Sequence, residues 1–212
     1  KIIEIPKFTA KDVLKKYKKK LLLGFDPQLF TASSLKRNFN NMCNFLPIEE
    51  NLIDKIYKEK NKYFINSFYS LNNKITGESF GSKVNRLIKK ITSNNIENIF
   101  ISSPENVAWL LNLRGKDNPN SPIPNCKIIL TNKKKIFFFS CPKKISQIKK
   151  DKQYKNLIFC TYKDFSKIIY QLKGKNFCID NLSCSISNES IIKKLFNIKL
   201  KVDPCYMMKS IK

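Results

Sequence analysis

An alternation of short apolar runs with amphipathic segments fills the second half of this sequence and constrains its fold more than any other feature. Four apolar runs have the length of buried strands, at 96–101, 156–160, 176–180 and 198–202. Three intervening segments are predicted to be helices, at 143–150, 162–172 and 187–196. Strands that alternate with helices in this way predict an α/β fold in which helices cover a sheet.

A hairpin and a further helix complete the pattern. Apolar runs at 127–130 and 135–139 flank a polar tetrapeptide that starts at Thr131, which predicts two antiparallel strands. Apolar residues recur at helical spacing over 80–91, with Thr76 as the expected N-cap. A hairpin within a βα alternation predicts a mixed β-sheet flanked by helices.

The chain is expected to contain one complete domain and part of another. The first segment alternates predicted strands at 2–5, 21–25 and 45–48 with predicted helices at 9–17 and 33–42. This is too little to close a sheet with both faces covered, so residues 1–57 are expected to need a neighbour to complete their core. Polar residues 58–76 are the expected linker. Residues 77–203 are the expected complete α/β domain.

The net charge of +25 suggests a module that binds polyanions or nucleic acid. Arg37, Arg86 and Arg114 are the three arginines, so 41 − 3 = 38 of the basic residues are lysines. Arginine is the side chain favoured for bidentate recognition of bases and phosphates. The lysines are also spread through almost every segment. We therefore favour solvated surface lysines over a specific nucleic-acid site, and keep the polyanion-binding module as the alternative.

Histidine is absent from this chain, which removes histidine bases and histidine-ligated metal sites. The seven cysteines form no CxxC pair, so we expect buried, reduced thiols and no metal site. Reduced thiols indicate a reducing compartment, and no apolar run is long enough to span a bilayer. A cytoplasmic protein without membrane contact, and without catalytic residues in this chain, is expected.

The segment from Ser103 to Pro124 carries the most distinctive side chains. Ser103 and Pro104 predict the start of a short helix that bears Trp109, the only tryptophan. The loop that follows contains Arg114 and Gly115 and is stiffened by prolines. An arginine on a stiff loop suits recognition of a carboxylate or a contact between domains. A local salt bridge between Arg114 and Asp117 is the other interpretation.

This segment resembles a block of the three-domain Xaa-Pro aminopeptidases that reads A-W-L-L-N-L-R-G-x-D-I-x-x-x-P. The residues that match as they stand are Ala108, Trp109, Leu110, Leu111, Asn112, Leu113, Arg114, Gly115, Asp117 and Pro122. Weaker matches follow the family's order at 24–29, 51–57, 76–83 and 203–212. The chain departs from the family at Tyr57, where Trp followed by Arg-Pro is usual and Lys58-Glu59 follow instead.

The resemblance implies a metal-dependent hydrolase that releases the first residue of a peptide with proline in second position. Its third domain, of pita-bread fold, binds two divalent ions, typically manganese, through two Asp, one His and two Glu. That ligand set is not in this chain, so we expect a non-catalytic N-terminal portion with two creatinase-like α/β domains, inactive alone. The resemblance also implies that residues 1–57 are the C-terminal part of an incomplete first domain and that 204–212 start the connection to the catalytic domain.

By the same resemblance, this portion contacts its own C-terminal catalytic domain and shapes access of the peptide to the active site. It would also help to assemble a homodimer of the full-length enzyme. Arg114 and Asn112 are the residues expected at the active-site entrance or at a domain interface, with Trp109 and Asp117 beside them.

Overall fold

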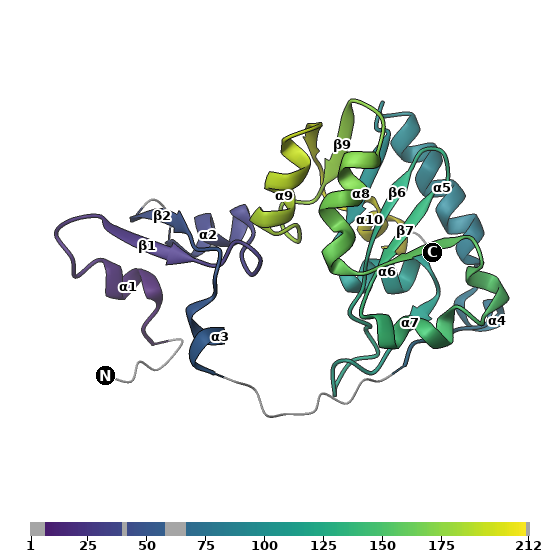
Figure 1. The fold of residues 1–212 in the computed structure, drawn as a ribbon, viewed down its shortest axis with the longest axis horizontal. Helices are drawn as coiled ribbons and strands as arrows, with labels where there is room; N and C mark the ends of the chain where they lie inside the picture. The colour runs from purple at the N-terminus through teal and green to yellow at the C-terminus, as the bar shows by residue number, and fades with distance from the viewer. Residues whose placement is uncertain (1–6, 40–41, 58–66, 211–212) are drawn as a thin grey trace. The chain divides into compact units, whose positions relative to one another are not determined.

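The computed structural model describes residues 7–39, 42–57 and 67–210. The chain divides into two compact units (Figure 1). Unit 1 comprises 1–61 and 185–188, and unit 2 comprises 62–184 and 189–212.

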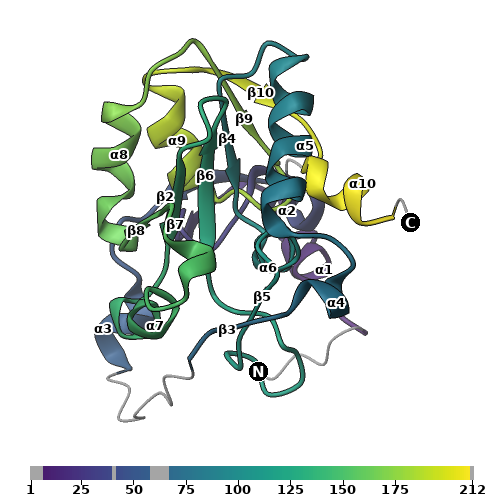
Figure 2. The ribbon, with the colours of Figure 1, turned by 90° about the vertical axis from the view of Figure 1, so that its right-hand side faces the viewer.

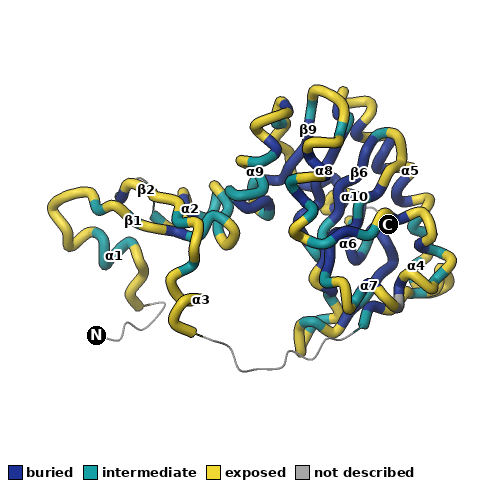
Figure 3. Tube along the Cα trace, viewed as in Figure 1, coloured by how far each residue is buried: buried dark blue, intermediate teal, exposed yellow. Residues whose placement is uncertain are grey.

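Unit 1 contains a two-stranded parallel sheet of β1 (Leu21–Phe25) and β2 (Cys43–Pro47). Its helices are α1 (Ala10–Leu14), α2 (Ala32–Phe39) and α3 (Leu52–Ile56). Strand β1 has the bounds that the sequence predicts, and the predicted strand at 2–5 lies outside the described residues. The apolar core is small, because α1 and α3 bury no residue and most of the unit is exposed (Figure 3).

Unit 2 is built on a six-stranded sheet with the strand order β10-β9-β4-β6-β7-β8. The strands are β4 (Asn98–Ile101), β6 (Lys127–Thr131), β7 (Ile136–Phe139), β8 (Leu157–Cys160), β9 (Asn176–Ile179) and β10 (Asn197–Leu200). Strand β6 is antiparallel to both β4 and β7, whereas the other pairs are parallel. This confirms the predicted mixed sheet, including the predicted hairpin.

Helices cover both faces of this sheet (Figure 2). The helices α5 (Phe80–Thr92), α6 (Pro104–Leu110), α7 (Pro142–Ile148) and α10 (Pro204–Ser210) contribute to one apolar cluster. The other cluster contains residues of α8 (Phe165–Gln171) and α9 (Ile186–Lys193). Successive strand residues point to opposite faces, so Ile99 and Ile101 belong to the first cluster and Phe100 to the second.

The start of α5 differs from the prediction. Thr76 does not cap α5 but is the last residue of α4 (Asn73–Thr76), and Gly77 ends that helix with a φ of 73°. Ser79 is the N-cap of α5, because its hydroxyl accepts from the N–H of Ser82 at 3.2 Å. A left-handed glycine reverses the chain between two helices, which the sequence pattern alone did not reveal.

Part of the expected linker is integrated into unit 2. Residues of β3 (Tyr69–Ser70) pair antiparallel with β5 (Leu113–Arg114). Phe68 is 5% exposed and packs edge-on against the Phe138 ring, with 5.7 Å between the centroids. The segment 67–76 therefore belongs to the domain that follows it, whereas 58–66 lie outside the described residues.

Candidate functional site

Helix α6 and the turn after it hold the sequence block that we singled out. The helix begins after Ser103 with Pro104 in its first turn, as predicted. It ends at Leu110, and Asn112 then adopts a left-handed backbone with a φ of 53°. Asparagine tolerates this conformation better than most residues. The turn at Asn112 directs the chain from α6 into β5.

A buried lysine fixes this turn. The Lys83 ammonium donates to Oδ1 of Asn112 at 2.6 Å and to the carbonyl oxygen of Trp109 at 3.0 Å. It also lies 4.6 Å from the centroid of the Trp109 ring, a cation–π distance. The Asn112 amide in turn donates to the carbonyl oxygen of Glu78 at 2.8 Å. We call this set, Lys83 with Trp109, Asn112 and Glu78, the lysine clamp.

The clamp is a buried polar network. Lys83 is 3% exposed and Asn112 is 1% exposed. Burial lowers the pKa of the Lys83 ammonium, and the nearby Glu78 carboxylate opposes that shift. The Glu78 carboxylate itself accepts from Nε of Arg86 at 3.0 Å and from its Nη2 at 2.7 Å. The clamp therefore links α5, α6 and the turn through hydrogen bonds of two buried side chains, Lys83 and Asn112, to half-buried neighbours.

Arg114 is held by backbone carbonyls. One guanidinium nitrogen donates to the carbonyl oxygens of Ala108 at 3.1 Å and of Leu113 at 2.8 Å. Asp117, the alternative partner of Arg114, instead forms an ion pair with Lys144 and accepts from the N–H of Asn125 at 2.5 Å. The described part of the chain contains no ion pair of Arg114, and its side chain is half-buried.

Gly115 closes the loop behind Arg114. A Cβ atom at this position would lie 2.7 Å from Cβ of Pro124 and 2.9 Å from its Cα. The N–H of Gly115 donates to the carbonyl oxygen of Pro122 at 3.0 Å. Only glycine fits this close approach of two backbone segments.

A second buried network joins α6 to the start of α10. Asn106 donates to Oδ2 of Asp203 at 2.6 Å, and the N–H of Cys205 donates to Oδ1 at 2.8 Å. Burial raises the pKa of Asp203, while the hydrogen bonds from Asn106 and Cys205 oppose that rise. Oδ1 of Asn106 is buried and has no partner among the described residues.

The described residues contain no group of three or more Cys, Asp or Glu side chains that could hold a metal ion. No disulfide joins the cysteines among them, and all but Cys141 are buried. Burial raises the pKa of Cys160 and Cys178 to about 11. Such thiols are protonated at neutral pH and are poor nucleophiles.

The structure brings together only part of the predicted site. Trp109 and Asn112 meet around Lys83, Arg114 contacts the same helix, and Asp117 lies in a separate pair with Lys144. Sequence reasoning did not assign Lys83 to the site. The signal was its position, three residues after Phe80 and four before Leu87, among the apolar positions of α5.

Comparisons with known proteins show the family of this chain. The family described as Creatinase/Prolidase N-terminal domain matches residues 59–212. A probable Xaa-Pro aminopeptidase P of Neosartorya fischeri is 27% identical over 195 residues, which cover 82% of this chain and 29% of the relative. One of Penicillium rubens is 33% identical over 109 residues, which cover 48% of this chain and 17% of the relative.

A solved structure shares the fold. The X-prolyl aminopeptidase of Caenorhabditis elegans, described as a cytosolic enzyme with a di-nuclear active site, superposes with a TM-score of 0.74 at 18% identity. The match covers 97% of this chain and 37% of that one.

The mixed sheet with helices on both faces defines unit 2 as a creatinase-like α/β domain. The chain belongs to the Creatinase/Prolidase N-terminal domain family. It spans less than a third of the length of the curated relatives named above. No helix in the described part of the chain has the length and apolar character needed to cross a membrane.

Replacing Lys83 tests the clamp. Lys83→Met keeps much of the buried stem but leaves Oδ1 of Asn112 and the Trp109 carbonyl oxygen without their donor. We expect the free energy of unfolding to fall by about 2 kcal/mol, the usual cost of unsatisfied buried acceptors. Urea unfolding followed by Trp109 fluorescence measures it. Lys89→Met, at an exposed position of the same helix, is the matched control, and equal losses in the two variants would contradict the clamp.

The Asp203 network predicts a pH effect. The pKa of Asp203 is higher in the folded chain than in the unfolded chain, where it is near 3.8. The folded chain therefore holds this proton more tightly, and the contribution of Asp203 to stability falls as the pH rises above about 3.8. Asp203→Asn removes the titration, and the Asn106 amide can turn its unpartnered oxygen toward the new donor. Relative to the original chain, the variant should gain stability between about pH 4 and about pH 7.

Urea unfolding across that pH range is the measurement. Glu105→Gln, an exposed carboxylate in the first turn of α6, is the control. A stability difference between the Asp203 variant and the original chain that stays constant with pH would refute the assignment.

Proposed function

We propose that this chain is a non-catalytic N-terminal portion of a metal-dependent Xaa-Pro aminopeptidase, a hydrolase that releases the first residue from peptides with proline in second position. The observation that carries the proposal is the A-W-L-L-N-L-R-G block at 108–115 inside a creatinase-like fold. The sequence identity to the probable Xaa-Pro aminopeptidase P of Neosartorya fischeri, over 82% of this chain, supports it.

The two units take different places in this proposal. Unit 1 is proposed as the C-terminal part of a first creatinase-like domain, because its sheet has two strands and α1 buries no residue. Unit 2 is proposed as the complete second domain, and 204–212 as the start of the path to a catalytic domain. Within the described residues α10 packs Cys205 and Met208 into the core of unit 2, so this path would begin from a fixed helix.

Metal chemistry is assigned to that further domain. The described residues do not fit a two-metal centre, because they offer no cluster of ligands and the sequence has no histidine. The C. elegans enzyme with this fold is described as having a di-nuclear active site. We propose two divalent ions, with manganese as the expected metal, in the catalytic domain, and no chemical step in this chain.

Arg114 is the residue proposed to act at the active-site entrance or against the catalytic domain. Its half-buried guanidinium is oriented by two carbonyl oxygens and has no ion-pair partner among the described residues. This arrangement suits a carboxylate of the peptide or of the neighbouring domain. Asn112 and Trp109 are proposed to position it through the lysine clamp, since Asn112 is too buried to contact a peptide itself. Asp117 is proposed to hold the loop through Lys144.

The remaining parts of the proposal concern the whole enzyme. The mostly buried cysteines, which form no disulfide among the described residues, and the cytosolic C. elegans enzyme support a cytoplasmic location. Assembly as a homodimer through the N-terminal domains is proposed from the family resemblance alone.

Arg114→Ala tests the entrance role in a protein that extends this chain through the catalytic domain. With manganese and short Xaa-Pro peptides, we expect KM to rise about tenfold with kcat little changed, the pattern of lost ground-state binding. Lys143→Ala, at an exposed position of α7, is the control. A kcat/KM value equal to that of the unaltered enzyme would remove Arg114 from the entrance.

A module that binds polyanions is the second candidate, and the charge of +25 is the observation that favours it. Binding through scattered lysines should weaken steeply with salt, because it depends on the release of counterions. We expect this chain to elute from heparin below about 150 mM salt, the range where nonspecific contacts are lost. Retention well above that concentration would favour the polyanion module over the aminopeptidase portion.

A further inference from the structure

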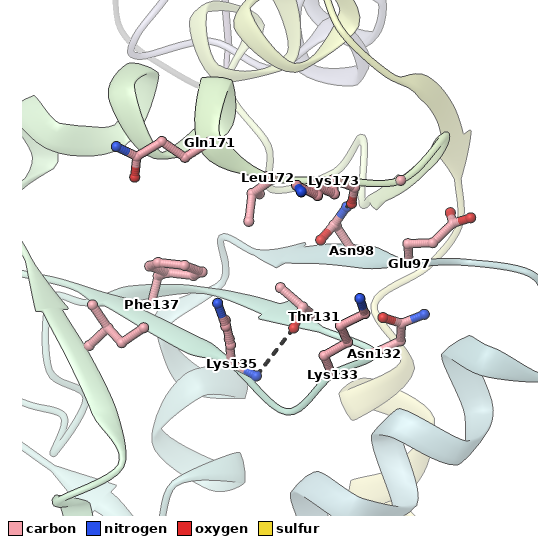
Figure 4. Close-up of a pocket in the computed structure, with 12 residues that line it drawn as sticks. Glu97, Asn98, Thr131, Asn132, Lys133, Lys135, Phe137, Gln171, Leu172 and Lys173 are labelled. Atoms are coloured by element: carbon pink, nitrogen blue, oxygen red, sulfur yellow. Dashed lines mark hydrogen bonds between the residues drawn. The ribbon is translucent and has the colours of Figure 1, made fainter.

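A pocket of about 600 Å³ lies on the sheet face opposite the lysine clamp. Its floor comes from neighbouring strand positions, with Asn98 opposite Thr131 in the β4–β6 pair and Phe137 opposite Ile158 in the β7–β8 pair. Its roof is the segment after α8, where Leu172 faces the sheet (Figure 4). The volume is within the range of small-molecule sites, which is about 300–1,000 Å³.

One half of the floor carries polar side chains that hydrogen bonds hold in fixed orientations. Asn98 is 1% exposed, and its amide nitrogen is fixed by a hydrogen bond to the carbonyl oxygen of Lys173 at 3.0 Å. No hydrogen bond within the described part of the chain reaches Oδ1 of Asn98, which lines the pocket. Thr131 accepts the N–H of Lys135 at 3.2 Å, so its hydroxyl hydrogen is available to a ligand (Figure 4). A buried acceptor and a hydroxyl donor are the polar groups that fix the orientation of a ligand.

The other half of the floor is apolar. Phe137 and Leu172 are half-buried against the second apolar cluster, and Ile158 is 42% exposed. An exposed isoleucine beside a phenylalanine offers apolar area that a flat ring would remove from water. This half of the pocket suits the apolar body of a ligand.

The rim is positively charged. Lys133, Lys135 and Lys173 are exposed lining residues. Glu97 is the acidic lining residue, and its carboxylate already accepts the N–H of Asn176 at 2.8 Å. Three ammonium groups against one engaged carboxylate favour an anion at the rim.

We propose that this pocket binds a small organic anion in which a flat ring with an N–H donor is joined to a phosphate, the chemistry of a purine mononucleotide. The ring lies over Phe137 and Ile158, its donor meets Oδ1 of Asn98, and the phosphate lies among the lysines of the rim. This site is independent of the aminopeptidase assignment, because none of its residues belongs to the clamp or the loop that carries Arg114.

Titration of this chain with AMP, adenosine and inorganic phosphate, followed by calorimetry, tests the proposal. We expect AMP to bind with a dissociation constant below about 1 mM and both fragments to bind about tenfold more weakly, since each retains only one half of the contacts. Phosphate or adenosine that binds as tightly as AMP would overturn the proposal, as would the absence of AMP binding.

Paired charge reversals locate the site. Lys133→Glu with Lys135→Glu should weaken AMP binding about tenfold, because the phosphate loses two neighbouring ammonium groups. Lys150→Glu with Lys152→Glu makes the same change in net charge at exposed positions outside the pocket and should leave binding within about twofold. Equal losses in both pairs would indicate nonspecific attraction and overturn the site.

Amide chemical shifts of labelled chain provide a measurement that needs no variant. On addition of AMP, the expected shifts fall on 131–135 and 171–174. Shifts spread evenly over the lysine-rich surface would overturn the proposal.

Discussion

The hydrogen bonds of one buried ammonium group hold together the turn between α6 and β5, where the distinctive sequence block lies. Lys83 reaches from α5 to the end of α6, where Oδ1 of Asn112 and the Trp109 carbonyl oxygen accept from it. Removing an ammonium group from water is costly unless its protons find acceptors, and here two oxygens and the face of an indole ring provide them. The burial of Lys83 is therefore tolerated only in the presence of this turn.

Other segments of the chain also form hydrogen bonds with this turn. The N–H of Leu71 donates to the carbonyl oxygen of Asn112 at 2.9 Å and so continues the β3–β5 pairing. The Tyr154 hydroxyl donates to the carbonyl oxygen of Leu111 at 2.8 Å from the other side. Carbonyl groups that a helix end leaves without partners are thus satisfied by three distant segments. Arg114 follows immediately, so its guanidinium extends from a rigid base.

Much of the fold could be predicted from the sequence where the pattern is local. Strand β1 and the hairpin of β6 and β7 follow from apolar runs and turn chemistry, and the structure confirms them. Elements stabilised by distant partners were missed. Strand β3 exists because β5 pairs with it, and α10 packs through Cys205 and Met208.

The candidate site shows the same difference between local patterns and distant contacts. The residues around Trp109 are adjacent in sequence and could be recognised together, whereas the partners that define their roles lie far along the chain. Asn112 and Lys83 are separated by 29 positions, and Asp117 and Lys144 by 27. A local motif can indicate that a loop is special, but it does not show whether an asparagine faces a ligand or a buried lysine. That distinction depends on tertiary contacts, and here they place the Asn112 side chain against a buried lysine.

The two faces of the central sheet differ in the hydrogen bonds of their polar groups. On one face, the clamp and the apolar cluster around α5 and α6 leave the polar groups of the turn satisfied. On the other, Asn98 and Thr131 present polar atoms to a pocket although both side chains are buried. An acceptor such as Oδ1 of Asn98 that faces a pocket can form a hydrogen bond with a ligand or with water. A face that retains such groups beside exposed apolar area is the face where a ligand would add stability, because binding to the folded chain alone shifts unfolding by mass action. The fold can therefore carry a binding site on one face of its central sheet while the other face holds the lysine clamp.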